Sequence, residues 1–296
     1  MKKYEFYTKL TELLYEKARA AHVTDLKKYY QPESVYKKQN HYFRLASSLQ
    51  NGTSSGMDRS IKFNGENQQV ISEILCDCDF KTVLTKYSKS EELYDEFCRW
   101  ITDSGAESRQ KRAEKAMAKG KDDDAERITN RKTNWEKYSE GLYLGAEFLN
   151  SKIGKEILDR MLGYNNSEDV NFKCVETDLR IISKEITGLG TALTCDWLKE
   201  CGCTWLVKPD VHIKKIYHAL RKAEGKKEID YSKIKDIDVI EYYYKWAKEL
   251  QNNGEDVTAY QLDKMIWLIC TGEFYLDKNE SIGRETIISE IEKIWS

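Results

Sequence analysis

Apolar residues recur every three or four positions over most of this chain, and only two of its 296 residues are prolines. That spacing is the period of an amphipathic α-helix, which proline would interrupt. No block alternates apolar and polar residues as a half-buried strand would. The pattern therefore predicts an all-α protein. The expected helices cover residues 4–21, 33–49, 68–75, 81–87, 91–101, 135–149, 153–162, 175–186, 191–201, 211–220, 237–250, 258–270 and 286–295.

Composition narrows the class of protein further. No apolar run has the length of a membrane span, and the N-terminus lacks the apolar core of a signal peptide. We therefore expect a cytoplasmic protein whose eight cysteines are reduced thiols. The cysteines at 76/78 and 201/203 are spaced C-x-C, whereas a zinc knuckle uses C-x-x-C, and so the sequence predicts no metal site.

The most informative stretch is residues 175–220, in which two predicted helices are joined by a glycine turn and a third helix follows. The turn is formed by residues 187–190, and Thr191 is placed to cap the second helix. Gly202 stands where a helix end favours a residue that tolerates positive φ. A short loop then leads to Asp210, at the start of the third helix.

A glycine turn that opens a helix is suited to anion binding. Because Gly188 and Gly190 have no side chains, the backbone can approach a phosphate closely, and the unpaired N–H groups of the helix start point toward it. Such contacts hold a duplex without reading its bases. The predicted phosphate-binding residues are Gly188, Leu189, Gly190, Thr191 and Ala192 in the turn, with Lys208, Lys214 and Lys215 nearby.

The glycine turn Gly188-Leu189-Gly190, followed after twenty residues by Asp210-Val211-His212-Ile213, resembles the signature of the helix-hairpin-helix base-excision DNA glycosylase superfamily. The resemblance covers residues 175–220. It implies two helical lobes with a cleft between them. It also implies that Asp210 assists departure of an extruded base, by stabilising an oxocarbenium-like sugar and by orienting or deprotonating water.

The chain departs from part of the family in two respects. Bifunctional members carry a lysine two residues after the second hairpin glycine, whose amine forms a Schiff base with the sugar. Ala192 occupies that position, which implies a monofunctional hydrolase. Lys208 is a nearby amine at a different spacing. Some members also hold a four-cysteine iron–sulfur cluster after the hairpin, but only Cys270 lies well beyond it here, and so we expect no cofactor.

The resemblance also suggests a domain organisation. Residues 1–65 are expected to pack with the C-terminal lobe, residues 66–174 to form a middle lobe, and residues 175–296 to hold the hairpin and the C-terminal helices. Within the middle lobe, residues 104–137 are highly charged, which predicts a solvated helical hairpin or a mobile insertion. Residues 51–65 form a polar segment, which predicts a surface loop with a DNA-facing loop as the alternative.

Two further groups of residues have defined expectations. Tyr242, Tyr243, Tyr244 and Trp246 lie within one predicted helix, where aromatic residues form core more often than base-stacking platforms. Asp263 is a candidate second carboxylate.

The expected function is that of a monomeric DNA glycosylase acting on duplex DNA. The net charge of −2 does not favour nucleic-acid binding, but residues 199–227 hold eight basic and three acidic residues, a local charge of +5. The main alternative is a non-catalytic hairpin module that binds DNA within a repair or defence complex, in which Asp210 only caps a helix. A third possibility is an RNA-directed glycosidase, which would depend on the 2′-hydroxyl.

Overall fold

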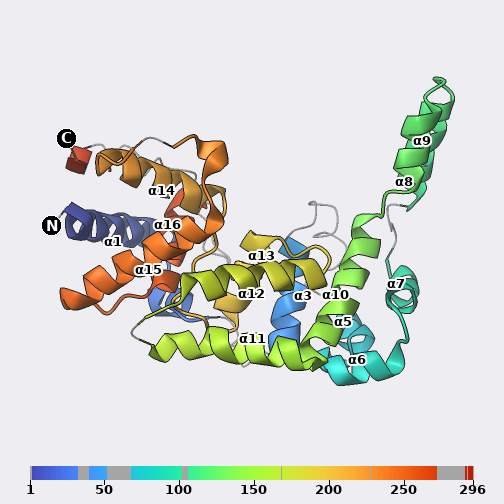
Figure 1. Cartoon of the computed structure of the whole chain (residues 1–296), viewed down its shortest axis with the longest axis horizontal. Coiled ribbons are helices and arrows are strands. Elements are labelled where there is room, and N and C mark those ends of the chain that lie inside the picture. The colour runs from blue at the N-terminus through green and yellow to red at the C-terminus, as the bar shows by residue number, and fades with distance from the viewer. Residues whose placement is uncertain are drawn as a thin grey trace. The chain divides into compact units, whose positions relative to one another are not determined.

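The structure, a computed structural model, describes residues 2–32, 40–51, 68–101, 106–167, 169–227, 229–271, 291 and 293–295. Over these ranges the regular secondary structure consists of helices without any strand, which confirms the all-α prediction (Figure 1). None of the described helices is both long and apolar enough to cross a membrane. Residues 52–65 of the predicted loop and most of the predicted helix 286–295 lie outside the described residues.

The chain divides into two compact units. Unit 1 contains Met1–Gln39, Arg160–Leu179 and Cys195–Ser296, and unit 2 contains Asn40–Asp159 and Arg180–Thr194. The division falls inside α11 (Lys152–Gly163), α12 (Phe172–Glu185) and α13 (Thr191–Glu200). The segments expected from the sequence, 1–65, 66–174 and 175–296, have boundaries that differ from those of the two units. As domain boundaries they stay a prediction.

Unit 1 is organised around the C-terminal helix α16 (Ala259–Thr271), which packs against α1, α14, α15 and η1. Its other complete elements are α1 (Lys2–Ala20), η1 (Leu26–Tyr30), η3 (Tyr164–Asn166), α14 (Val211–Ala223), η4 (Tyr231–Lys233) and α15 (Asp236–Asn252). The core is aromatic: the ring of Phe6 stacks on Trp246 at a centroid distance of 5.6 Å. The aromatic residues predicted to be core, Tyr242, Tyr243, Tyr244 and Trp246, are all buried.

Unit 2 is organised around α10 (Asn134–Asn150), which packs against α3, α6 and α7. Its other complete elements are α3 (His41–Asn51), α5 (Gln68–Ile74), η2 (Cys76–Cys78), α6 (Phe80–Lys86), α7 (Ser90–Cys98), α8 (Ala106–Met117) and α9 (Asp122–Thr129). Helices α8 and α9 pack on each other, and so the charged insertion is a helical hairpin (Figure 1). The Nη1 atom of Arg109 on α8 lies 2.8 Å from Oε2 of Glu136, which joins this hairpin to the first turn of α10.

Two glycines let α10 approach its neighbours within unit 2. A Cβ atom at Gly141 would lie 2.4 Å from the carbonyl oxygen of Thr187, the first residue of the glycine turn. At Gly145 it would lie 2.1 Å from Cδ2 of Leu45 on α3. Because α10 carries no side chain at these points, its backbone lies directly against the turn and against α3.

Candidate functional site

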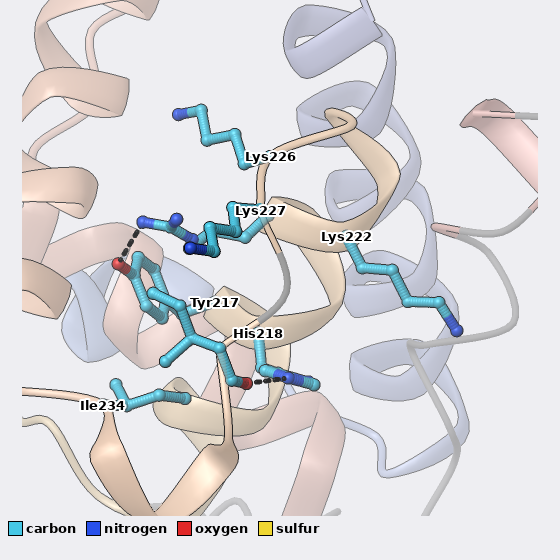
Figure 2. A pocket seen from close by; sticks show the side chains of 8 residues that line it. Tyr217, His218, Lys222, Lys226, Lys227 and Ile234 are labelled. Carbon is cyan, nitrogen blue, oxygen red and sulfur yellow. Dashed lines mark hydrogen bonds between the residues drawn. The ribbon is translucent and has the colours of Figure 1, made fainter.

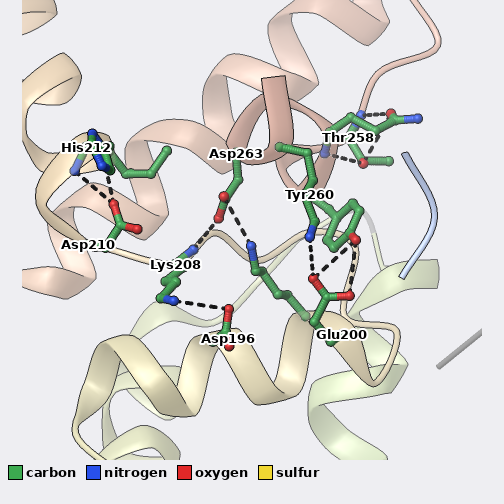
Figure 3. Close-up of polar contacts among 12 residues, drawn as sticks. Asp196, Glu200, Lys208, Asp210, His212, Thr258, Tyr260 and Asp263 are labelled. Atoms are coloured by element: carbon green, nitrogen blue, oxygen red, sulfur yellow. Dashed lines mark hydrogen bonds and ion pairs between the residues drawn. The ribbon is translucent and has the colours of Figure 1, made fainter. Parts of the chain in front are cut away.

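Asp210 immediately precedes α14, and its side chain caps that helix (Figure 3). Its Oδ1 atom accepts hydrogen bonds from the backbone N–H groups of His212, at 2.9 Å, and Ile213, at 3.1 Å. Both bonds use the same oxygen, and within the described ranges Oδ2 receives no hydrogen bond. The residue is half-buried. One carboxylate oxygen is therefore fixed by the helix, and the other has no hydrogen-bond donor among the described residues.

The backbone just before Asp210 is held by Lys208. The N–H group of Asp210 donates to the carbonyl oxygen of Lys208 at 2.7 Å, which closes a three-residue γ-turn around Pro209. The N–H group of Lys208 donates in turn to Oδ2 of Asp263 on α16, at 2.6 Å. The position of Asp210 is thus linked to a helix more than fifty residues later in the chain.

The side chain of Lys208 is also engaged. Its Nζ atom lies 3.3 Å from Oδ1 of Asp196 on α13, and only 20% of the side chain is exposed. The negative charge of Asp196, helped by Asp210 and Asp263, raises the pKa of Lys208 against the opposing effect of burial. The amine is therefore held as an ammonium ion. This pairing does not test the predicted phosphate contact of Lys208, which stays a prediction.

Beneath this loop lies a group of paired charges that we call the charge cluster: Asp196, Lys199, Glu200, Lys208, Asp263 and Lys264 (Figure 3). Lys199 Nζ lies 3.1 Å from Asp263 Oδ1, and Lys264 Nζ lies 2.8 Å from Glu200 Oε1. Three acids face three bases, so the cluster is neutral. Burial raises the pKa of Asp263, and the neighbouring Lys199 opposes that effect.

The charge cluster corrects one part of the sequence interpretation. Lys199 was counted in the basic stretch expected to face DNA, but only 3% of the residue is exposed and its charge is paired with Asp263. Asp263 was expected as a single carboxylate, whereas it is paired with Lys199 and bonded to the Lys208 N–H. The available signal was the presence of adjacent opposite charges, Lys199-Glu200 and Asp263-Lys264, in helices that are otherwise mostly apolar.

The glycine turn belongs to unit 2, whereas Asp210 belongs to unit 1, and each is described within its own unit. Gly188 has a φ of +90°, which favours glycine, and both Gly188 and Gly190 are exposed. The first hydrogen bond of α13 runs from the Thr194 N–H to the Gly190 carbonyl oxygen, at 2.9 Å. Gly190 is therefore the cap, and Thr191, predicted as the cap, is the first helical residue.

The start of α13 has the donors that an anion site needs. Because the first intrahelical bond is donated by Thr194, the amides of Thr191, Ala192 and Leu193 have no acceptor within the helix. Leu189 is buried and anchors the turn, whereas Thr191 and Ala192 are half-buried. These amides, which have no acceptor among the described residues of the helix, and the helix dipole both favour an anion at this position.

The outer face of α14 is basic, although several of its charges are paired. Lys214 Nζ lies 2.5 Å from Oδ1 of Asp236. Lys215 and Lys222 are exposed, and over the described ranges neither has a carboxylate partner. Near the end of α14, basic side chains line a small hollow beside His218, whose Nε2 lies 3.0 Å from the Ile229 carbonyl oxygen (Figure 2). These basic residues are Arg221, Lys222, Lys226 and Lys227.

The absence of a metal site stays a prediction. In the part of the chain that the structure describes, no three His, Cys, Asp or Glu side chains are grouped so as to hold a metal ion.

Comparisons with known proteins found no match to this chain among family models, curated proteins or solved structures. The functional interpretation therefore depends on the motif in residues 175–220 and on the geometry around Asp210.

Proposed function

We propose that this protein is a DNA glycosylase that extrudes a damaged or modified base from duplex DNA and hydrolyses its N-glycosidic bond, leaving an abasic site. The observation that carries the proposal is the arrangement of the Asp210 carboxylate. Its Oδ1 is held by two backbone donors at the start of α14, and its Oδ2 is left for the reaction. A carboxylate fixed in this way can act on a bound sugar without first reorganising.

Asp210 would have two roles in this reaction. As the bond between C1′ and the base nitrogen breaks, the electron pair leaves with the base and the sugar develops positive charge, which the carboxylate stabilises. Water then adds to C1′. The Oδ2 atom orients this water and accepts its proton, and a proton from solvent adds to the departed base nitrogen, which completes hydrolysis.

The local chemistry supports hydrolysis without strand cleavage. Ala192 has no amine, and the amine of Lys208 is protonated and paired with Asp196. An amine must be deprotonated to attack a sugar. We therefore expect borohydride to trap no covalent complex between the protein and DNA at neutral pH. A trapped complex that is lost in Lys208→Met would show that Lys208 is a nucleophile after all.

Duplex binding would use backbone amides in unit 2 and basic side chains in unit 1. The amides of Thr191 and Ala192 would bind one phosphate. Lys215 and Lys222, exposed on α14, would contact others. Because Lys208 and Lys214 are already paired with acids, a phosphate contact by either would require it to exchange partners.

The test of this function is release of free base, measured by mass spectrometry, from duplexes that contain oxidised purines, alkylated purines or the modified bases of foreign DNA. The native protein and Asp210→Asn are compared on each duplex. Base released by the native protein alone supports the proposal and identifies the substrate. Equal release by both proteins would contradict the role of Asp210.

Gly190→Ala tests the phosphate site without disturbing the fold. A Cβ atom at Gly190 has nothing within 4 Å and the residue does not have positive φ, so the expected loss of stability is only the cost of alanine at a helix cap, about 1 kcal/mol. The same Cβ would stand where a phosphate must approach the turn. We expect DNA affinity to fall about tenfold, roughly the loss of one charged hydrogen bond, as measured by fluorescence anisotropy. Unchanged affinity would show that the glycine turn does not contact DNA.

The alternative of a non-catalytic hairpin module is favoured by one observation. The two hydrogen bonds that Asp210 accepts are those of an ordinary helix cap, which needs no reaction to explain it. A protein that binds DNA with a strong salt dependence but releases none of the tested bases would support this alternative.

A further inference from the structure

The loop that delivers Asp210 has no regular secondary structure, and yet most of it is buried. Between α13 and α14, Cys203, Trp205, Leu206 and Val207 are all buried. Hydrogen bonds to α11 and η3 hold the first half of this loop. The Thr204 N–H donates to Oδ1 of Asn165 at 2.9 Å, and the Trp205 indole N–H donates to the Met161 carbonyl oxygen at 2.9 Å. The second half, from Val207 to Asp210, depends on Lys208.

Lys208 is held at three of its atoms. Its backbone N–H donates to Asp263, its Nζ pairs with Asp196, and its carbonyl oxygen accepts the N–H of Asp210. The bond to Asp263 is 2.6 Å long and charge-assisted, a class of hydrogen bond stronger than one between neutral groups. Any displacement of Asp263 is therefore passed through Lys208 to the backbone of Asp210.

Asp263 is itself held rigidly. Only 2% of the residue is exposed, and each carboxylate oxygen has a partner: Oδ1 pairs with Lys199 on α13, and Oδ2 accepts the loop N–H. Its side chain thus joins α16, α13 and the loop at one point (Figure 3). The pair of Lys199 and Asp263 is enclosed, because only 3–4% of either side chain is exposed.

Stability alone does not explain these buried charges. Removing an ion pair from water costs several kcal/mol per ion, and apolar residues of similar volume commonly hold two helices together as well or better. Apolar contacts, however, cannot orient a backbone N–H group. A buried carboxylate can, because its hydrogen bond has a direction and an unpaired N–H at this depth would be costly.

We propose that Asp263 is a positioning residue for Asp210: it fixes the Lys208 backbone, through which the catalytic carboxylate is held at the start of α14. This inference rests on the proposed function. Asp263 does not touch the substrate. Its role is to keep the Asp210 carboxylate within the narrow range of positions from which it can act on C1′, where a displacement of about 1 Å can cost a hundredfold in rate.

A pair of double variants separates positioning from mere structural support. In Lys199→Met/Asp263→Asn, the buried charges are removed together, and the asparagine oxygen can still accept the Lys208 N–H. Lys199→Met/Asp263→Leu has a similar volume but no acceptor. We expect the Asn variant to release base within about fivefold of the native single-turnover rate, and the Leu variant to be at least about 30-fold slower with DNA affinity unchanged.

The neighbouring ion pair provides a matched control. Glu200 and Lys264 are also buried and lie on the same two helices, but neither is bonded to Lys208. The variant Glu200→Gln/Lys264→Gln should therefore retain the native excision rate when its folded fraction, measured by circular dichroism, is taken into account. A loss as large as that of the Leu variant would show that any disturbance of the charge cluster slows the reaction, and would overturn the specific role of Asp263.

Hydrogen exchange of the peptide covering residues 204–210 separates the proposed positioning role of Asp263 from the proposed glycosylase function. The Leu variant should exchange faster at the Lys208 amide than the Asn variant. If the native protein releases base and the two variants exchange and react alike, the positioning role is overturned while the glycosylase proposal stands. If the native protein releases no base, both proposals fail, and faster exchange in the Leu variant then reports only a structural link between α16 and the loop.

Discussion

Replacing Asp210 with asparagine is expected to lower the single-turnover rate of base release about 10³-fold, with DNA still bound. Asparagine caps a helix as well as aspartate does, and so the bonds from the His212 and Ile213 N–H groups should remain. The substitution removes the negative charge that stabilises the sugar and the base that accepts a proton from water. Thermal unfolding, anisotropy and base release, measured on one preparation, would test the three expectations together.

Asp210→Ala is the control for the capping role. It removes both the cap and the charge, and so it should lose about 1 kcal/mol of stability in addition to the activity. The asparagine variant should lose activity alone. If Asp210→Asn released base within about tenfold of the native rate, the loss would be too small for a catalytic carboxylate. Asp210 would then be a helix cap only.

Gly141→Ala is expected to destabilise unit 2 by about 2–3 kcal/mol, although alanine favours a helix more than glycine does. The new Cβ would lie 2.4 Å from the Thr187 carbonyl oxygen, a backbone atom that cannot move without shifting the glycine turn. We therefore expect weaker DNA binding as well as lower stability. Urea denaturation would measure the first effect and anisotropy the second.

Gly163→Ala is the matched control for this steric argument. Gly163 ends α11 with helical backbone angles, and a Cβ added there meets nothing within 4 Å. Alanine should therefore be neutral or stabilise the protein by up to about 1 kcal/mol. If Gly141→Ala stabilised the protein to the same extent, the conclusion that α10 lies against the Thr187 carbonyl oxygen would be contradicted.

The local features around Asp210 could be predicted because they depend on a few neighbouring residues. Gly202 was expected at a helix end, and its φ of +118° and the hydrogen bond from the Cys203 N–H to the Leu198 carbonyl oxygen confirm this. Asp210 was expected at the start of a helix, and it caps α14. In both cases the residue type and the helical phase determine the backbone within one turn.

The long-range features could not be predicted in the same way. The local charge count gave Lys199 the same weight as Lys215, but Lys199 is buried against Asp263, 64 positions later, and Lys215 is exposed. Gly141 has a similar explanation: its need for a small residue comes from Thr187, which is distant in sequence. Which face of a helix meets which partner is decided by packing, and helical periodicity alone does not identify the partner.

The order of charges in the charge cluster has a consequence for the alignment of α13 with α16. Lys199-Glu200 on one helix faces Asp263-Lys264 on the other, so each base meets an acid. A shift of one residue in one direction would oppose Glu200 to Asp263, and a shift in the other direction would oppose Lys199 to Lys264, so that either shift places like charges together in a buried setting. A smooth apolar contact would tolerate such a slip. Of these three alignments, only the native one pairs each base with an acid.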